Sequence, residues 1–167
     1  NWENEDVEFM NSMAIRQRIR DFGFDLLLNE SVTIPKGNDT IAIIGTENWG
    51  KKKEYNYGDI PKSMKGTEHL PCKIMLTHDP SFWEDSICGK LDVDLTLSGH
   101  THASQIGFEI GNFKWSPAKY RFEQYDGLTE KNGEYILVSR GIGCVGVPVR
   151  IGLSPEYSVI TLKSKKQ

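Results

Sequence analysis

The amino-acid sequence predicts a layered α/β or α+β fold. Near the N-terminus the apolar residues have helical spacing, whereas several later apolar runs have the length of buried strands. Helices and strands do not alternate strictly along the chain, which favours a mixed arrangement of layers over a regular parallel sheet. With 167 residues, 38% of them hydrophobic, the chain can form one core but is short for two independent domains.

The segment from about residue 4 to residue 22 is predicted to form an amphipathic helix. Val7, Met10 and Ala14 recur at helical intervals. Acidic residues are concentrated at the start of this segment and arginines at its end, as the helix dipole favours. Gly23 follows directly and is suited to the C-terminal cap.

A β-hairpin is predicted after this helix. Residues 25–28 and 31–34 are its first strand-like stretches, and residues 40–44 form its second arm. The intervening residues 35–39 include proline, glycine and asparagine, which favour a turn.

The middle of the chain predicts a loop, two short helices and a buried strand. Residues 49–57 are polar and aromatic without a period, which is typical of a surface loop. Asp59 can cap a short helix that stops at Gly66. Residues 73–77 form a short apolar run of buried-strand type, and a short helix over residues 80–88 is expected to follow it.

The remaining predicted elements are strands, interrupted by one long polar segment. That segment, residues 112–133, is longer than usual for a loop, and it is expected either to border a substrate groove or to form a packed surface flap. The predicted strands are residues 91–98, 105–110, 135–139 and 157–162.

Composition and charge argue against several classes of function. Twenty lysines and arginines stand against 23 acidic residues, so the chain offers no broad cationic surface and we expect no nucleic-acid partner. Cys72, Cys88 and Cys144 lie far apart, which predicts neither a zinc knuckle nor a disulfide framework. We find no signal peptide and no membrane-spanning run in this chain, and the compartment is left open.

Histidines follow two of the predicted buried strands. His78 ends the first, and His100 and His102 end the second within a Gly-His-x-His turn. If the two strands are neighbours, all three imidazoles gather at one edge of the sheet, where α/β folds commonly bind ligands. Imidazole is a ligand for zinc, iron, manganese and copper, so the pattern predicts a metal site at this edge.

Each of these histidines also has an ordinary interpretation. A single histidine is more often structural or exposed than a ligand, and His69 is predicted to be an ordinary loop residue. The Gly-His-x-His turn is more specific, and the joint pattern is stronger than its parts. In such a turn, two side chains can point to different metal ions of a pair.

Four sequence blocks are more informative together than each is alone. The blocks are Leu76-Thr77-His78-Asp79-Pro80, then Asp94-Leu95-Thr96-Leu97-Ser98-Gly99-His100-Thr101-His102 with Gln105-Ile106, then Arg140-Gly141-Ile142-Gly143, and finally Pro155-Glu156. In this order they resemble the bacterial calcineurin-like metallophosphoesterases of the YkuE and YaeI type. The resemblance extends over about the whole chain, and the Gly-His-x-His block is its most specific part.

This resemblance implies an α/β/β/α sandwich, of which the chain is the C-terminal portion, with a site for two divalent metal ions (Mn, Fe or Zn). His78 and His100 match the ligands of one metal ion, and His102 matches a ligand of the other. Family members hydrolyse phosphomonoesters or phosphodiesters with a metal-bridging hydroxide as the nucleophile. A small phosphoester is therefore the expected substrate, and relatives are often membrane-associated or exported.

Earlier blocks of the family pattern are not found in the 167 residues. These are Asp-x-His, Gly-Asp-x-x-Asp and Gly-Asn-His-Asp, which supply the bridging aspartate, further ligands and the histidine that protonates the leaving group. We therefore expect residues 1–167 to be a partial domain without its N-terminal half, in preference to a divergent member with other ligands. No catalytic residue is assigned within the chain.

The isolated chain is expected to have little activity. Three neutral imidazoles cannot offset the repulsion between two divalent cations, so we expect at most one weakly bound metal ion and little turnover. Two other interpretations are kept, namely a non-catalytic binding or structural module that retains the histidine turn, and a hydrolase with a single zinc ion held by three histidines.

Four further charged residues are weighed for roles near the site. Arg140 and Arg150 could contact a substrate phosphate through the guanidinium fork, or could serve packing and surface salt bridges. Arg140 is taken as the tentative substrate-binding residue. Asp92 and Asp94 precede a strand and are predicted to have turn and capping roles.

Self-association is a further expectation. A sandwich without one half exposes a sheet edge and an apolar face, which favours contact between copies.

Overall fold

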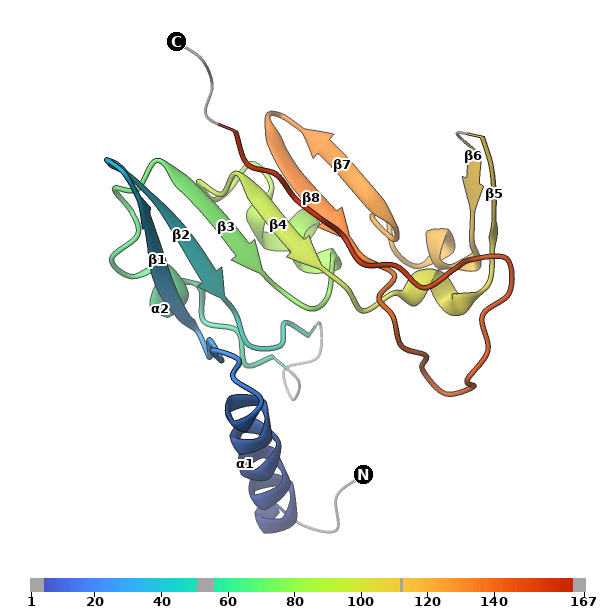
Figure 1. The fold of residues 1–167 in the computed structure, drawn as a ribbon, viewed down its shortest axis with the longest axis horizontal. Coiled ribbons are helices and arrows are strands. Elements are labelled where there is room, and N and C mark those ends of the chain that lie inside the picture. Colours follow the sequence, from blue (N-terminus) through green and yellow to red (C-terminus); the bar gives the residue numbers. More distant parts are fainter. Residues whose placement is uncertain (1–4, 51–55, 112, 164–167) are drawn as a thin grey trace.

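A six-stranded mixed sheet forms the body of the molecule (Figure 1). The computed structural model describes residues 5–50, 56–111 and 113–163. The strand order is β1-β2-β3-β4-β8-β7, with parallel pairing from β2 to β8 and an antiparallel strand at each edge. The six strands are β1 (Glu30–Lys36), β2 (Asp39–Gly45), β3 (Cys72–Leu76), β4 (Leu95–Ser98), β7 (Gly127–Lys131) and β8 (Glu134–Val138). This architecture confirms the predicted layered α/β class.

In the described part of the chain, a smaller sheet and five helical segments complete the fold. The small sheet consists of β5 (Phe108–Ile110) and β6 (Phe113–Trp115). The helical segments are α1 (Glu5–Asp21), α2 (Ile60–Met64), the π-helical η2 (Trp83–Ile87), and the 3₁₀ turns η3 (His102–Gln105) and η4 (Pro117–Tyr120). Within the described residues, no helix has the length and apolar character needed to cross a bilayer.

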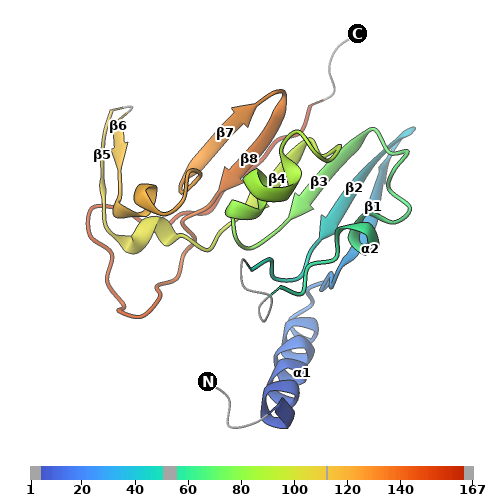
Figure 2. The same ribbon diagram turned by 180° about the vertical axis from the view of Figure 1, so that it is seen from behind.

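Helices α2 and η2 cover one face of the six-stranded sheet, as seen from behind in Figure 2. The alternation along each strand directs one set of side chains to this face. The hydrophobic core lies there, and its large aromatic residues are Trp83 of η2 and Phe82 directly before it. The buried residues of this core are Ala42, Ile44, Met75, Phe82, Trp83, Ile87, Val93, Ile136 and Val138.

The predicted N-terminal helix and the short second helix are both confirmed. Helix α1 ends as expected at Gly23, which has a left-handed φ of 84° and donates its amide to the Arg20 carbonyl at 2.8 Å. Helix α2 is capped by Asp59, whose carboxylate accepts the Lys62 amide at 3.0 Å. Helix α1 extends away from the sheet (Figure 1).

The hairpin of β1 and β2 is confirmed, but the strand predicted over residues 25–28 is wrong. Asn29 has a left-handed φ of 55°, which turns the chain just before β1 begins. Gly37 supplies the left-handed residue in the turn between the two strands. Of the loop predicted over residues 49–57, residues 51–55 lie outside the described part, and the others are irregular.

Three later predictions need correction. The strand predicted over residues 91–98 begins only at Leu95, because the preceding residues form a loop in which the Asp94 carboxylate accepts the Lys73 amide at 2.8 Å. The strand predicted over residues 105–110 is shortened to β5, since the chain is still left-handed at Gln105. Residues 157–162 lie in a stretch without strand pairing.

The helix expected over residues 80–88 is present, but its main part is the π-helical η2.

Segment 112–133 is not the structureless excursion that its polarity suggested. Apart from residue 112, which lies outside the described residues, it contains β6, η4 and β7. Strand β7 pairs with β8 across Asn132 and Gly133, whose φ values are 58° and 84°. An Asn-Gly pair with two left-handed residues is the preferred two-residue hairpin turn, so this signal in the sequence was overlooked.

Candidate metal centre

His78 and His100 meet at the carboxyl ends of two neighbouring parallel strands, β3 and β4. The Nε2 atom of His78 lies 3.1 Å from Nδ1 of His100, and the two rings are edge-to-face with centroids 4.9 Å apart. Hydrogen bonds continue past the strand ends, because the Gly99 amide donates to the His78 carbonyl at 3.1 Å. The strand pairing itself therefore brings these two histidines together.

The separation of the two nitrogens fits a shared metal ion. Two imidazole nitrogens bound to one tetrahedral zinc ion lie about 3.3 Å apart, given Zn–N bonds of about 2.0–2.1 Å. Burial, with a smaller effect from the neighbouring His100, lowers the pKa of His78 below its ordinary value of 6.5. The neutral imidazole, which is the form that binds a metal ion, is therefore favoured at neutral pH.

His102 lies on the same turn but does not join this pair. Its Nδ1 atom is 3.4 Å from Nη2 of Arg150. Arginine only donates, so in this arrangement Nδ1 accepts and the neutral ring carries its hydrogen on Nε2. Within the described residues, no group of three or more histidine, cysteine, aspartate or glutamate side chains has the geometry of a metal site. The chain thus provides two facing imidazoles and a third imidazole turned to an arginine.

The turn that carries His100 and His102 has an unusual backbone. Five of its residues have left-handed φ values, between 46° and 67°, although none of them is glycine. The five residues are His100, His102, Ala103, Ser104 and Gln105. Left-handed φ values are unfavourable for residues other than glycine. Packing and hydrogen bonds must therefore hold the turn in place.

Three polar side chains anchor this turn. Thr101 donates its hydroxyl to the Tyr125 carbonyl at 2.6 Å, and Ser116 donates to the Ala103 carbonyl at 2.5 Å. The buried Gln105 donates its amide to the carbonyls of Val147 and Val149 at 3.0 and 2.9 Å. Gln105 therefore fixes the loop of residues 141–150 against the histidine turn, a role that the sequence did not reveal.

Asp79 is a second residue near the histidines that the sequence analysis left without a role. Its carboxylate accepts the Ser81 amide at 2.9 Å and also the Ser81 hydroxyl. Its other oxygen lies 4.0 Å from Nε2 of His100. A carboxylate directly after His78 was visible in the sequence, but its orientation towards His100 depends on how β3 and β4 pair.

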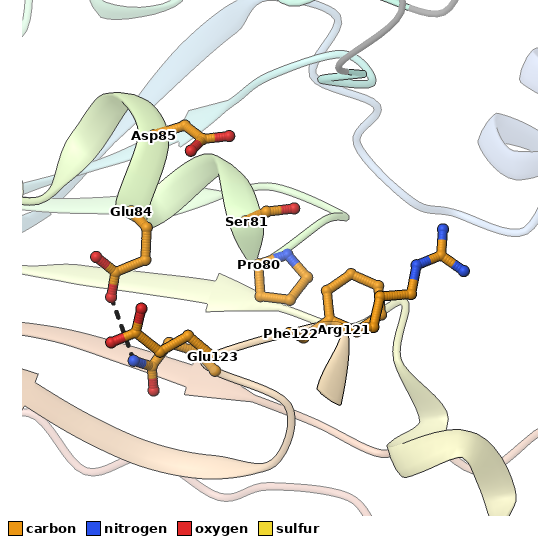
Figure 3. Close-up of a pocket in the computed structure, with 8 residues that line it drawn as sticks. Pro80, Ser81, Glu84, Asp85, Arg121, Phe122 and Glu123 are labelled. Carbon is orange, nitrogen blue, oxygen red and sulfur yellow. Dashed lines mark hydrogen bonds between the residues drawn. The ribbon is translucent and has the colours of Figure 1, made fainter. Parts of the chain in front are cut away.

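A cavity of about 180 Å³ lies between residues 80–85, which follow His78, and residues 121–124 (Figure 3). Phe122 lines it and places its ring edge-to-face with His100 at a centroid distance of 5.5 Å. Part of its wall, Arg121 to Gln124, comes from segment 112–133, for which a groove was one of the two expectations. On the opposite wall, Glu84 accepts a hydrogen bond from Gln124 at 3.2 Å, drawn as a dashed line in Figure 3.

Arg140 lies in a network of ionic contacts. Each nitrogen of its guanidinium group is within 3.3 Å of a carboxylate oxygen of Glu109, Asp126 or Glu156. The side chain is only 9% exposed. These contacts correspond to the salt-bridge role weighed for this residue, and a role in substrate binding stays a prediction.

Comparison with known proteins gives several relatives. An uncharacterized metallophosphoesterase of Aquifex aeolicus (strain VF5) is 33% identical over 150 residues, which are 88% of this chain and 54% of the relative. The uncharacterized protein YpbG of Bacillus subtilis (strain 168) is 30% identical over 161 residues, 96% of this chain and 56% of that protein. The uncharacterized metallophosphoesterase YkuE of the same bacterium is 36% identical over 93 residues, 54% of this chain and 31% of YkuE.

These relatives are longer than the chain. The chain spans about half the length of the first two curated relatives. No protein-family model and no solved structure matches it.

Proposed function

The chain belongs to the calcineurin-like metallophosphoesterases, and on that basis we propose that it forms part of a metal-dependent phosphoester hydrolase. The proposal concerns the activity of the whole protein, because the chain spans about half the length of its relatives. Its substrate class would be phosphomonoesters or phosphodiesters of small molecules.

The observation that carries the proposal is the meeting of His78 and His100. Their nitrogens lie 3.1 Å apart, close to the separation that a shared tetrahedral metal ion requires. These residues are also the ones that match ligands of one metal ion in the family pattern. His102, on the same turn, is proposed as a ligand of the second metal ion after its contact with Arg150 is released.

The residues of this chain would hold the centre and keep it accessible. His78 and His100 would bind as neutral imidazoles, and the left-handed turn carries His102 two residues after His100. When bound, the metal ions would lower the pKa of water to give a hydroxide nucleophile and would offset charge on the phosphoryl group. Asp79, 4.0 Å from His100, would orient that ring.

For the isolated chain we propose weak binding of one metal ion and no turnover. Two facing imidazoles are fewer ligands than the four of a typical zinc site. The carboxylates that would separate the charges of two metal ions are expected in the remaining part of the protein. A non-catalytic module that only keeps the histidine turn is the second candidate, since no group of three suitable ligands is formed within the described residues.

Metal titration of histidine variants tests the proposal. Calorimetric titration of the chain with Zn²⁺ or Mn²⁺ is expected to give one weak site. We expect His78→Ala and His100→Ala each to weaken binding about tenfold or more, because each removes one of the facing ligands. The exposed His69 provides the control, and His69→Ala should leave the affinity unchanged.

The alternatives give different results in the same experiment. Equal losses in the His69 and His78 variants, or no binding to the unmodified chain, would support the non-catalytic module. Tight binding of two metal ions, together with hydrolysis of a generic phosphodiester by the chain itself, would contradict the half-site proposal. Turnover with a single tightly bound zinc ion would favour the mononuclear hydrolase.

A further inference from the structure

Two arginines lie near the histidine turn, and their surroundings differ. Arg140 donates from Nε to the Glu156 carboxylate at 2.8 Å, and its Nη2 lies 2.7 Å from the same carboxylate. Its Nη1 donates to the Glu109 carboxylate at 3.1 Å. Asp126 adds a further carboxylate oxygen 3.3 Å from Nε. The charge of Arg140 is therefore offset within the fold, and its donors are already engaged.

Arg150 has no such compensation. Its Nη2 atom donates to the backbone carbonyls of Arg140, Gly141 and Gly143 at 2.9, 3.1 and 2.5 Å. Its Nε and Nη1 atoms are buried and have no hydrogen-bond partner among the described residues. None of the ion pairs formed by the described residues includes Arg150. The Arg150 side chain as a whole is partly buried, and withdrawing a guanidinium group from water without a counter-charge is costly, so such groups are usually paired.

The fold holds Arg150 beside the histidines by two independent backbone connections. The next residue, Ile151, donates its amide to the Gln105 carbonyl at 2.8 Å and accepts the Gly107 amide at 2.9 Å. The Gln105 side chain also fixes the loop before Arg150 through the carbonyls of Val147 and Val149. Nη2 lies 3.4 Å from the His102 ring as a result. The position of this cation is thus built into the fold.

We propose that Arg150, and not Arg140, binds the phosphoryl oxygens of the substrate. The phosphoryl group would supply the negative charge that the fold leaves out, through hydrogen bonds from the guanidinium group of Arg150. This inference rests on the proposed function for the class of ligand. It differs from that proposal because it assigns anion binding to a residue outside the metal ligands and does not require a metal ion.

Nuclear magnetic resonance of the unmodified chain is the most direct test. Inorganic phosphate is titrated into the chain labelled with ¹⁵N-arginine at constant ionic strength, with chloride as the matched anion. The Nε–H signal of Arg150, assigned by its loss in Arg150→Lys, is expected to shift and saturate. The Nε–H signal of Arg140 serves as the internal control and should stay in place, because Glu156 already accepts that hydrogen.

A variant comparison measures the size of the effect. Arg150→Gln is expected to weaken phosphate binding about tenfold or more, whereas Arg150→Lys should give a smaller loss because it keeps the charge without the planar fork. Arg121→Gln is the matched control, since Arg121 lines the cavity described above and its removal changes the net charge equally (Figure 3). Circular dichroism of each variant checks that it is folded.

The outcomes separate this inference from the proposed function. An Arg150 signal that does not move with phosphate, or a loss of binding in Arg121→Gln equal to that in Arg150→Gln, would overturn the assignment. Because the titration is done without metal ions, phosphate binding at Arg150 can be observed even if the histidines bind no metal ion. Metal binding by the histidines can likewise be observed even if Arg150 does not bind phosphate.

Discussion

Asp126 and Glu156 contact the same arginine, yet their pKa values shift in opposite directions. Burial raises the pKa of Asp126 above its ordinary value of 3.8, and the charges of Arg140 and Lys114 only partly counter this effect. Burial also acts to raise the pKa of Glu156, but hydrogen bonds from the backbone amide and guanidinium of Arg140 outweigh it, so that this pKa falls below 4.5. The same ionic network therefore contains one carboxylate that is costly to ionise and one that is stabilised by ionisation.

The first prediction is that Asp126→Asn stabilises the chain at pH 7. Because the pKa of Asp126 is higher in the folded than in the unfolded chain, the protonated side chain contributes stability below pH 3.8. This contribution is lost as the pH rises through the pKa of the folded state. The neutral asparagine avoids that loss, so its urea midpoint should exceed that of the unmodified chain at pH 7. The advantage should disappear as the pH is lowered past 3.8.

Glu156→Gln is the control for this prediction, with the opposite sign. The pKa of Glu156 is lowered in the folded chain, so its carboxylate contributes stability above pH 4.5. This contribution is lost as the pH falls through the pKa of the folded state. The glutamine variant should be less stable than the unmodified chain at pH 7, and the difference should shrink in acid. Equal destabilisation by both variants at pH 7 would show that Asp126 contributes mainly as a salt-bridge partner.

The second prediction concerns the strained histidine turn. Ser104 is exposed and has a φ of 54°, where a non-glycine residue costs about 1 kcal/mol. Ser104→Gly should therefore raise the free energy of unfolding by up to about 1 kcal/mol, partly offset by the greater freedom of glycine in the unfolded chain. Ser31→Gly within β1 is the control and should lower it. A loss of stability in Ser104→Gly would mean that the serine side chain itself supports the turn.

At the scale of elements, Asn29 joins three segments of the chain through its side chain. The residue is 4% exposed and lies between α1 and β1. Its amide group donates to the Glu47 carboxylate and the Tyr57 carbonyl, both at 2.8 Å. Its oxygen accepts the amides of Glu47 at 3.0 Å and Asp59 at 2.9 Å. One side chain thus organises the entry to β1, the segment after β2 and the start of α2.

The third prediction is that Asn29→Gly lowers the free energy of unfolding by about 3 kcal/mol, since it leaves several buried polar groups unpaired. Glycine tolerates the left-handed φ of 55°, so the change tests the hydrogen bonds and not backbone strain. Asn132→Gly is the matched control, because Asn132 is also left-handed but lies exposed in the β7–β8 turn. Urea unfolding compares the two, and similar midpoints would contradict the role given to Asn29.

At the scale of the whole molecule, one face of the six-stranded sheet is apolar, buried at its centre, where Ile74 is 5% exposed, and exposed on β1 and β8. The strand register places Val32, Ile43, Ile74, Leu95 and Tyr135 across from one another on the face opposite the hydrophobic core. Val32 and Tyr135 are each 42% exposed. In Figure 1 the C-terminal segment passes in front of this face, with its own side chains Tyr157 and Val159 exposed.

The fourth prediction is that the chain associates with itself through this apolar face and the open edge of β1. Exposed apolar surface of this kind favours contact between copies. Sedimentation velocity of the isolated chain should show dimers or larger species that increase with concentration. Val32→Lys combined with Ile34→Lys should shift the distribution to monomer, because both side chains lie on this face.

The control for this experiment is Thr33→Lys, which adds a lysine to the same strand but on the other face of the sheet. It should leave the association unchanged. A chain that stays monomeric over the whole accessible concentration range would contradict the expectation of an uncovered sandwich half.

The fold class, the order of the main elements and the position of the histidines at strand ends could be predicted from the amino-acid sequence. Helical spacing, buried runs and capping residues are local properties, so α1, α2, the β1–β2 hairpin and the strands before His78 and His100 could all be found from neighbouring residues. The exceptions were also local. The Asn-Gly turn between β7 and β8 could have been predicted from the sequence but was not. The left-handed backbone of Asn29 separates residues 25–28 from β1, so the strand predicted there does not form.

Which of these residues contact one another depends on how the whole chain packs. His78 and His100 are 22 residues apart, and their 3.1 Å contact depends on β3 and β4 being parallel neighbours in register. Arg150 is 48 residues from His102, and it reaches that ring because Gln105 ties down the loop before it. Contacts between segments so far apart in the sequence arise from the packing of the whole chain, so spacing alone could not distinguish the arginine neutralised by carboxylates from the one left without a counter-charge.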